Sequence, residues 1–196
     1  IAHIRLSRDA TFATLDLCAG TLALSRSLLK RFPFAKIFAV DFSQAMLSQG
    51  LKKLPVGLSD HIIPVCADAL QLPFANESMD VVMCGYGLRN VDDLSKAITE
   101  IRRVLKPNGQ LLVLDFFRPV RLVTKIFFWT YAPIVVATLG RLISRHKSAY
   151  TYLRQSILKF VSTQEFVDLL KKQGFVDTQV DDFLMSVSTC VSTYRS

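Results

Sequence analysis

Hydrophobic and polar positions along the chain form two alternating patterns. Short apolar runs, most of them rich in β-branched residues, stand at 12–17, 36–40, 62–66, 79–84 and 110–116. Between them apolar residues recur every three or four positions, as they do from Leu94 to Leu105. The first pattern predicts buried strands and the second amphipathic helices, and their alternation is typical of βαβ units in a parallel sheet.

Residues typical of helix ends define where several of these elements begin and end. Ser43 is a favoured helix N-cap after the second apolar run, and the Pro- and Gly-containing segment 106–109 is expected to end the helix before the fifth run. A last helix is expected to begin at Ser162 or Thr163 and to end before Gly174. The predicted helices therefore have definite starts and stops.

The chain ends in two more predicted strands, 176–180 and 183–193, and the pair Asp181–Asp182 between them is typical of a turn. Together with the five βα units, this hairpin predicts an α/β fold: a Rossmann-like, doubly wound, seven-stranded sheet with one antiparallel strand. A chain of 196 residues has room for one hydrophobic core, so we expect a single domain over residues 1–196.

The stretch 122–143 departs from this pattern, because it is almost wholly apolar apart from Lys125 and Arg141. A transmembrane helix needs about 20 uninterrupted apolar residues, and Pro133 further breaks the interval between the two cations. We therefore expect helices that cover a pocket, within an insertion spanning residues 118–160.

The charge and the cysteine content of the chain bear on its binding partners and on its cellular compartment. The chain carries 24 Lys and Arg against 16 Asp and Glu, a formal charge of +8, and no acid occurs between Asp115 and Glu165. Such a balance favours anionic partners, although an ordinary cationic enzyme is equally compatible with it. The four cysteines stand singly, without the spacing of a zinc or redox site, so we expect no metal and a reducing, cytoplasmic compartment.

Candidate chemistry gathers just after the predicted strands, where doubly wound sheets bind their ligands. Gly20 lies in the turn Cys18–Thr21 and allows the backbone to approach a cofactor. Asp41, about 20 residues further on, is placed to accept both ribose hydroxyls, unless it only caps a helix or faces solvent. Asp68 follows the third strand and could accept from an adenine amino group.

The first turn also favours one class of cofactor. A dinucleotide fingerprint needs three glycines, whereas Gly20 is alone in its turn with Leu22 and Leu24 close behind it. S-adenosylmethionine carries no phosphate to cradle, so it fits this turn better than a nicotinamide dinucleotide does.

Longer motifs in the chain point to one protein family. The run Gly87–Asn90 and the pattern Tyr150-x-Tyr152-Leu153-x-x-Ser156-Ile157 are far more discriminating than the turn. With the segments DLCAGTLALS, AVDFSQAML, CADALQLPF and RVLKPNGQLLVLDFFRP, this chain resembles the quinone-biosynthesis C-methyltransferases from about Asp16 to Phe175. These class I enzymes methylate demethylmenaquinol and the related ubiquinone precursor with S-adenosylmethionine.

The resemblance implies a set of cofactor contacts: Ala19, Gly20, Thr21, Asp41, Asp68, Ala69 and Gly85. It also exposes departures, because the family's first turn usually reads G-G-T-G and Leu22 stands at its last glycine. We expect Leu22 to weaken cofactor binding, since a Cβ obstructs positive φ and close approach. The family's N-terminal helices, which cover the cofactor, are expected to be absent from a chain that starts at Ile1.

Carbon methylation needs an aligned methyl donor and a ring carbon activated by loss of a neighbouring hydroxyl proton. Arg89 and Asn90, after the fourth strand, could stabilise the developing phenolate, and Tyr86 could carry a proton. The ordinary alternative for Arg89 is a surface ion pair with Asp92 or Asp93.

The expected substrate is a prenylated quinol, and the basic insertion suggests peripheral contact with an anionic membrane. The sequence does not decide whether the chain forms a homodimer. One alternative is an enzyme of the same fold acting on another small molecule. A nucleic-acid methyltransferase would carry a proline-aromatic loop after the fourth strand, so no nucleic acid is expected. A non-catalytic binding protein is the third alternative.

Overall fold

The computed structural model describes residues 1–55, 57–120, 147–183 and 188–196, with the backbone alone for 147–150. The helices expected between residues 122 and 143 therefore lie outside the described residues. Within the described ranges, the chain forms a seven-stranded sheet in the order β3-β2-β1-β4-β5-β7-β6. Its strands are β1 (Ala13–Leu17), β2 (Lys36–Asp41), β3 (Ile62–Cys66), β4 (Met79–Gly85), β5 (Leu105–Asp115), β6 (Phe175–Phe183) and β7 (Ser188–Arg195).

The strand directions confirm the predicted doubly wound sheet. Neighbouring strands from β3 to β5 pair in parallel, whereas β7 pairs antiparallel with both β5 and β6. The order reverses beside β1, because β2 and β3 lie on one side of it and β4 and β5 on the other. This reversal is the topological switch point at which such sheets bind ligands.

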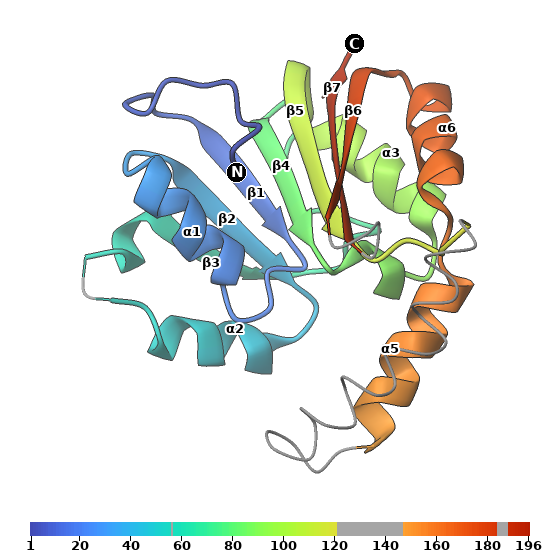
Figure 1. Ribbon diagram of the computed structural model, residues 1–196. Helices are drawn as coiled ribbons and strands as arrows, with labels where there is room; N and C mark the ends of the chain where they lie inside the picture. The colour runs from blue at the N-terminus through green and yellow to red at the C-terminus, as the bar shows by residue number, and fades with distance from the viewer. Residues whose placement is uncertain (56, 121–146, 184–187) are drawn as a thin grey trace.

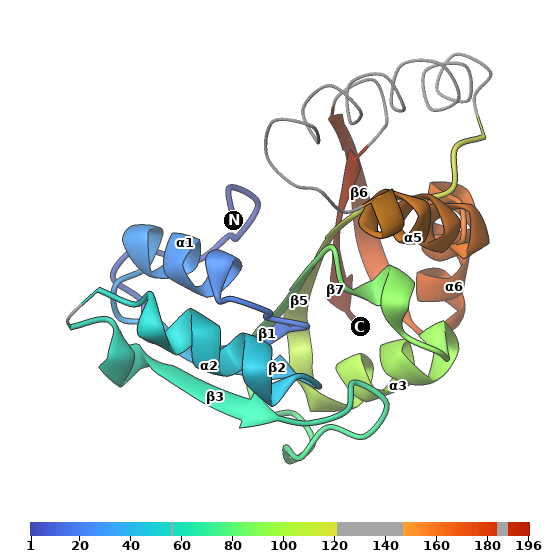
Figure 2. The same ribbon diagram turned by 90° about the horizontal axis from the view of Figure 1, so that it is seen from below.

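Helices cover both faces of the sheet (Figures 1 and 2). On one face lie α1 (Ala23–Arg31) and α2 (Gln44–Lys52), and on the other α3 (Leu94–Val104) and α6 (Thr163–Lys172). The helix α5 (Lys147–Lys159) extends past the edge where the parallel strands end (Figure 1). Two short 3-10 turns, η1 (Ser59–His61) and η2 (Leu88–Asn90), complete the described elements.

Each face of the sheet has its own hydrophobic core, because successive side chains of a strand point to opposite faces. In β4, Val82 and Cys84 belong to the core beneath α3 and α6, whereas Val81 and Met83 belong to the core beneath α1 and α2. The strands are therefore apolar on both sides, as their continuous apolar runs predict.

The predicted end of the α3 helix is slightly late, and the fifth strand begins earlier than expected. The helix ends at Val104, and β5 begins at Leu105 despite Pro107. The pairing register with β4 shifts between Leu105 and Gln110. Because residues 106–109 lie within that shift, the missing N–H of Pro107 removes no regular ladder bond.

The expected turn at Asp181–Asp182 is wrong, whereas the last helix is confirmed. Both acids belong to β6, where they pair with Cys190 and Thr189 of β7. The strand lies at the edge of the sheet, so acidic side chains can face solvent there. In α6, Ser162 caps the helix and forms a reciprocal capping box with Glu165.

Candidate functional site

A cavity of about 370 Å³ opens at the carboxyl ends of the strands, at the switch point of the sheet. Its size is typical of a small-molecule site. The wall is formed by residues at the ends of β1 and β2 and by residues that follow β1, β2, β3 and β4: Leu17, Cys18, Val40, Asp41, Phe42, Ala67, Asp68, Ala69, Leu70, Tyr86, Gly87, Asn90, Val91 and Asp92.

Asp41, the residue expected to bind the ribose, lies on the cavity wall, and two backbone groups hold its carboxylate in place. The Gly20 N–H donates to Oδ2 and the Ser43 N–H donates to Oδ1, each at 2.8 Å. A carboxylate oxygen can accept more than one hydrogen bond. The side chain is therefore oriented in advance and can still accept from a ligand's hydroxyl groups.

The predicted first turn lies beside the cavity rather than on its described wall. Gly20 has a φ of +51°, which a glycine adopts without steric cost, and its amide contacts Asp41. Ala19 donates its N–H to the Val40 carbonyl oxygen at 2.9 Å, and Thr21 follows Gly20 in the same turn. Cys18 is the member of this segment that reaches the wall.

Leu22 does adopt the backbone conformation that the missing glycine predicts. It stands before α1 with a φ of 64°, and its side chain is fully buried. A Cβ built on Gly50 would lie 2.6 Å from the Leu22 Cγ, which shows how closely the leucine packs on α2. The bulk of Leu22 therefore points into the core and not into the cavity.

The turn after β3 contributes Asp68 and Ala69, both expected to contact the cofactor, to the wall. The carboxylate of Asp68 accepts the Leu70 N–H at 2.8 Å, and its carbonyl oxygen accepts the Gln71 N–H at 3.1 Å. These bonds form a compact turn. It presents a carboxylate beside backbone groups, the combination that can recognise an adenine edge.

Gly87, rather than the predicted Gly85, is the glycine at the wall. A Cβ on Gly85 would meet Leu24 on the other face of the sheet, away from the cavity. A Cβ on Gly87 would lie 2.3 Å from the Cys18 Cβ, so no larger residue fits there without movement. The backbone at Gly87 must therefore be bare for β1 and the η2 loop to approach each other.

Tyr86 and Asn90 line the cavity, whereas Arg89 lies behind them. The Tyr86 ring packs on Phe116 with centroids 4.7 Å apart, and its hydroxyl lies 3.1 Å from Ser188 Oγ. A φ of 59° at Tyr86 marks strain at this position, which is typical of functional loops.

Arg89 is held by a buried ion pair with Asp115, and not by the surface pair with Asp92 or Asp93 that was the alternative to a role at the phenolate. Its Nη1 lies 2.6 Å from Asp115 Oδ1, and the two side chains are 10% and 0% exposed. Burial raises the pKa of Asp115, and the positive charge of Arg89 opposes that rise. The same Nη1 donates to the Tyr86 carbonyl oxygen at 2.6 Å. Arg89 thereby fixes the loop that carries Tyr86 and Asn90.

Two residues for which the sequence predicted no role in the site also lie at the cavity or contact its wall. Phe42 follows Asp41, lines the cavity and is 81% exposed, which is unusual for a phenylalanine. Tyr152 of α5 donates its hydroxyl to Asn90 Oδ1 at 3.0 Å. The position of Phe42 next to the predicted acid was an available signal. Tyr152 belongs to the discriminating motif, but only folding brings it to Asn90.

Asp16 lies beneath the first turn, outside the cavity, and is fully buried. Its Oδ2 accepts from the Ser25 N–H at 3.0 Å and from the Ser25 hydroxyl at 2.5 Å. Burial raises the pKa of Asp16 to about 7, although the bonds from Ser25 oppose the rise. This carboxyl therefore gains a proton near neutral pH.

The described ranges hold neither a metal-binding cluster nor a helix suited to cross a membrane. No three His, Cys, Asp or Glu side chains gather there as a metal site would require. None of the helices in these ranges combines the length and the apolar character needed to cross a membrane.

Comparison with known proteins gives consistent matches. The model of the ubiE/COQ5 methyltransferase family matches residues 3–194. Demethylmenaquinone methyltransferases of Staphylococcus aureus strains JH9 and Newman are 33% identical over 185 residues, which cover 92% of this chain and 75% of each relative.

Solved structures show the same fold at low sequence identity. An S-adenosylmethionine-dependent methyltransferase from Aquifex aeolicus matches with a TM-score of 0.70 and 15% identity, over 97% of this chain and 85% of that one. Phosphoethanolamine N-methyltransferase 2 of Haemonchus contortus, solved with S-adenosyl-L-methionine, matches with a TM-score of 0.69 and 15% identity, over 95% of this chain and 49% of that one. The predicted methyltransferase fold is thereby confirmed.

Proposed function

This chain belongs to the ubiE/COQ5 methyltransferase family, and from that membership we propose that it methylates a ring carbon of demethylmenaquinol, a prenylated quinol. The methyl donor is S-adenosylmethionine, as in the family. The observation that carries the proposal is the cavity itself, because the fixed carboxylate of Asp41 and the Asp68–Ala69 turn stand on one side and Tyr86 and Asn90 on the other.

The residues of the cavity fit this cofactor. We assign the ribose hydroxyls to Asp41, whose carboxylate is already oriented by two amides. The adenine amino group is assigned to Asp68, and its ring face to the exposed ring of Phe42. The bare backbone at Gly87 leaves room for the remaining part of the molecule.

The cofactor supplies an electrophilic methyl group, and the protein has to hold the quinol ring in line with it. We propose that Asn90 donates a hydrogen bond to the quinol oxygen next to the reacting carbon and stabilises the phenolate that develops there. Tyr86 is proposed to carry the proton that this oxygen releases. Arg89 holds the loop through Asp115 and Tyr86, and adds a positive charge behind it.

We further propose that the insertion 118–160 covers the quinol and its prenyl chain, within a single domain. Of this insertion, α5 lies at the edge that bears the cavity, where Tyr152 meets Asn90. The basic residues of the insertion would then face an anionic membrane surface, from which a prenylated substrate can enter. Peripheral attachment of a cytoplasmic enzyme follows from this proposal.

A titration with S-adenosylhomocysteine, the product form of the cofactor, tests the assignment of the cavity. Asp41→Ala is expected to lose about 1.5–3 kcal/mol of binding free energy, the contribution of a hydrogen bond to a charged group. Asp60→Ala, on η1, is the matched control and is expected to bind as the wild type does. An unchanged midpoint for Asp41→Ala would remove this carboxylate from the site.

A further inference from the structure

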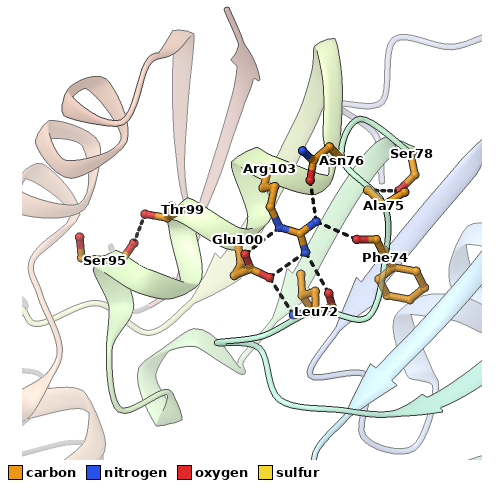
Figure 3. A network of polar contacts seen from close by, with 9 residues as sticks. All are labelled: Leu72, Phe74, Ala75, Asn76, Ser78, Ser95, Thr99, Glu100 and Arg103. Atoms are coloured by element: carbon orange, nitrogen blue, oxygen red, sulfur yellow. Dashed lines mark hydrogen bonds and ion pairs between the residues drawn. The ribbon is translucent and has the colours of Figure 1, made fainter.

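An ion pair between Glu100 and Arg103, both on α3, contacts the loop between β3 and β4 (Figure 3). Neither residue lines the cavity. The Nε and Nη2 atoms of Arg103 donate to the two carboxylate oxygens of Glu100, each at 2.8 Å. Three more bonds run from the guanidinium to the loop, to the carbonyl oxygens of Leu72 and Phe74 and to Asn76 Oδ1, at 2.9, 2.7 and 2.9 Å. Glu100 Oε2 in turn accepts the Leu72 N–H at 2.8 Å.

The completeness of this network sets it apart from an ordinary surface pair. A guanidinium has five N–H groups, and the five bonds of Arg103 give each of them an acceptor. A pair three residues apart on a helix normally contributes little, because solvent screens it. Here most of the bonds lead to a different segment, so the pair links α3 to the loop.

The loop that Arg103 and Glu100 bind is continuous with the turn that we assign to adenine. Only Gln71 separates Leu72 from Leu70, the last wall residue of that turn. Ala69 and Leu72 are both buried in the core beneath α3 and α6. On its other side, the turn follows β3, and the Ala67 N–H donates to the Asp41 carbonyl oxygen at 3.2 Å. The turn is therefore held at one end by the sheet and at the other by Arg103 and Glu100.

We propose that Arg103 and Glu100 are positioning residues that set the base specificity of the cofactor site, by holding the Asp68–Leu70 turn against the adenine edge. This inference rests on the proposed function of the cavity. Adenine offers an amino donor beside a ring-nitrogen acceptor, and hypoxanthine reverses both. A carboxylate held rigidly at the amino group rejects hypoxanthine, whereas a mobile turn can move aside and accept it.

The experiment compares the binding of S-adenosylhomocysteine and S-inosylhomocysteine by calorimetry. The wild type is expected to prefer the adenine compound by about tenfold or more, as the loss of one hydrogen bond to a charged group implies. Arg103→Met and Glu100→Gln are expected to shrink this preference by about tenfold or to abolish it. Arg103→Lys should lie between, because a lysine cannot reach all the acceptors of a planar guanidinium.

Two controls separate base specificity from general damage. Arg118→Met removes another close ion pair, in which Arg118 Nη2 lies 2.6 Å from Glu165 Oε2. This variant is expected to keep the wild-type preference for the adenine compound. Asp41→Ala should weaken both ligands equally, because it acts at the ribose. Thermal melts establish that each variant is folded, and if Arg103→Met does not fold, Arg103→Lys and Glu100→Gln decide.

Folded variants at Arg103 and Glu100 that keep the full preference would overturn the inference. A wild type that binds neither compound would instead contradict the proposed cofactor site. The two failures are therefore distinguishable in one data set.

Discussion

The hydroxyl of Tyr152 on α5 donates to Asn90 Oδ1 at 3.0 Å, and so joins a helix of the covering insertion to the loop after β4. Because the carbonyl oxygen of the Asn90 amide accepts from Tyr152, the NH₂ group is the donor that this cavity-lining side chain can offer to a ligand. The proposed donor to the quinol oxygen is thus oriented by a residue 62 positions away.

Tyr152→Phe is expected to lower kcat about 3- to 10-fold, the effect of losing roughly one neutral hydrogen bond. The dissociation constant of S-adenosylhomocysteine should not change, since the phenol acts on Asn90 and not on the cofactor. Tyr194→Phe is a suitable control, because no partner of the buried Tyr194 hydroxyl is found among the described residues. A Tyr152→Phe enzyme with wild-type kcat would show that Asn90 needs no such support.

Arg89 and Asp115 should behave as one unit. Arg89→Ala leaves a buried carboxylate without its partner, and is expected to cost about 3–5 kcal/mol of unfolding free energy. Adding Asp115→Asn should recover most of that loss, whereas kcat should stay low because the loop has lost its tie to the Tyr86 carbonyl.

Urea unfolding and initial rates of the single and double variants measure the two effects separately. Recovery of both stability and rate in the double variant would show that Arg89 contributes nothing to catalysis beyond neutralising Asp115.

The raised pKa of the buried Asp16 carboxyl predicts that folding stability depends on pH. Its pKa is raised to about 7 in the folded protein, above the ordinary value of 3.8, so the folded state binds the proton more tightly than the unfolded state does. This group therefore favours folding most at low pH, and its contribution falls as the pH rises from about 4 to about 7. Asp16→Asn should flatten that part of the stability profile, measured by urea midpoints between pH 5 and pH 8. A slope unchanged in the variant would mean that Asp16 titrates as an ordinary acid.

Membrane contact is testable with vesicles. Each basic side chain near an anionic surface contributes about 1 kcal/mol, and the attraction decays within a Debye length. The protein is therefore expected to co-sediment with anionic liposomes at low salt and to dissociate as salt rises. Neutralising Arg141, Arg145 and Lys147 should weaken binding, whereas neutralising Lys52 and Lys53, on and after α2, should not. Equal binding to neutral and anionic vesicles would contradict the electrostatic proposal.

The sequence predicts the sheet well because its apolar runs and helical periods are strong local signals. Asp181 and Asp182 mislead, because acids next to each other favour turns in general but also suit an edge strand. Leu22 has the positive φ that was expected, yet its side chain lies in the core. Substituting glycine there would therefore remove buried apolar surface as well as relieve strain, and the loss of packing should dominate folding stability.

Residues at the ends of parallel strands can be placed at the cavity from the sequence. Residues that contact the site from distant positions in the sequence cannot. Asp41, Asp68, Ala69, Tyr86 and Asn90 all reach the cavity wall, since parallel strands bring their carboxyl ends together. The partners Asp115 and Tyr152 were not predicted, because their contacts bridge 26 and 62 positions that carry no periodic signal.

The most direct measurement of the proposed activity is transfer of a radiolabelled methyl group from S-adenosylmethionine. Demethylmenaquinol, the demethylated ubiquinone precursor and a tail-less quinol are supplied side by side, each kept reduced. The label is expected in a carbon–methyl bond of demethylmenaquinol, at a rate that falls when Asn90 is replaced by Ala. Absence of label from every quinol, in a protein that binds S-adenosylhomocysteine normally, would contradict the proposed reaction.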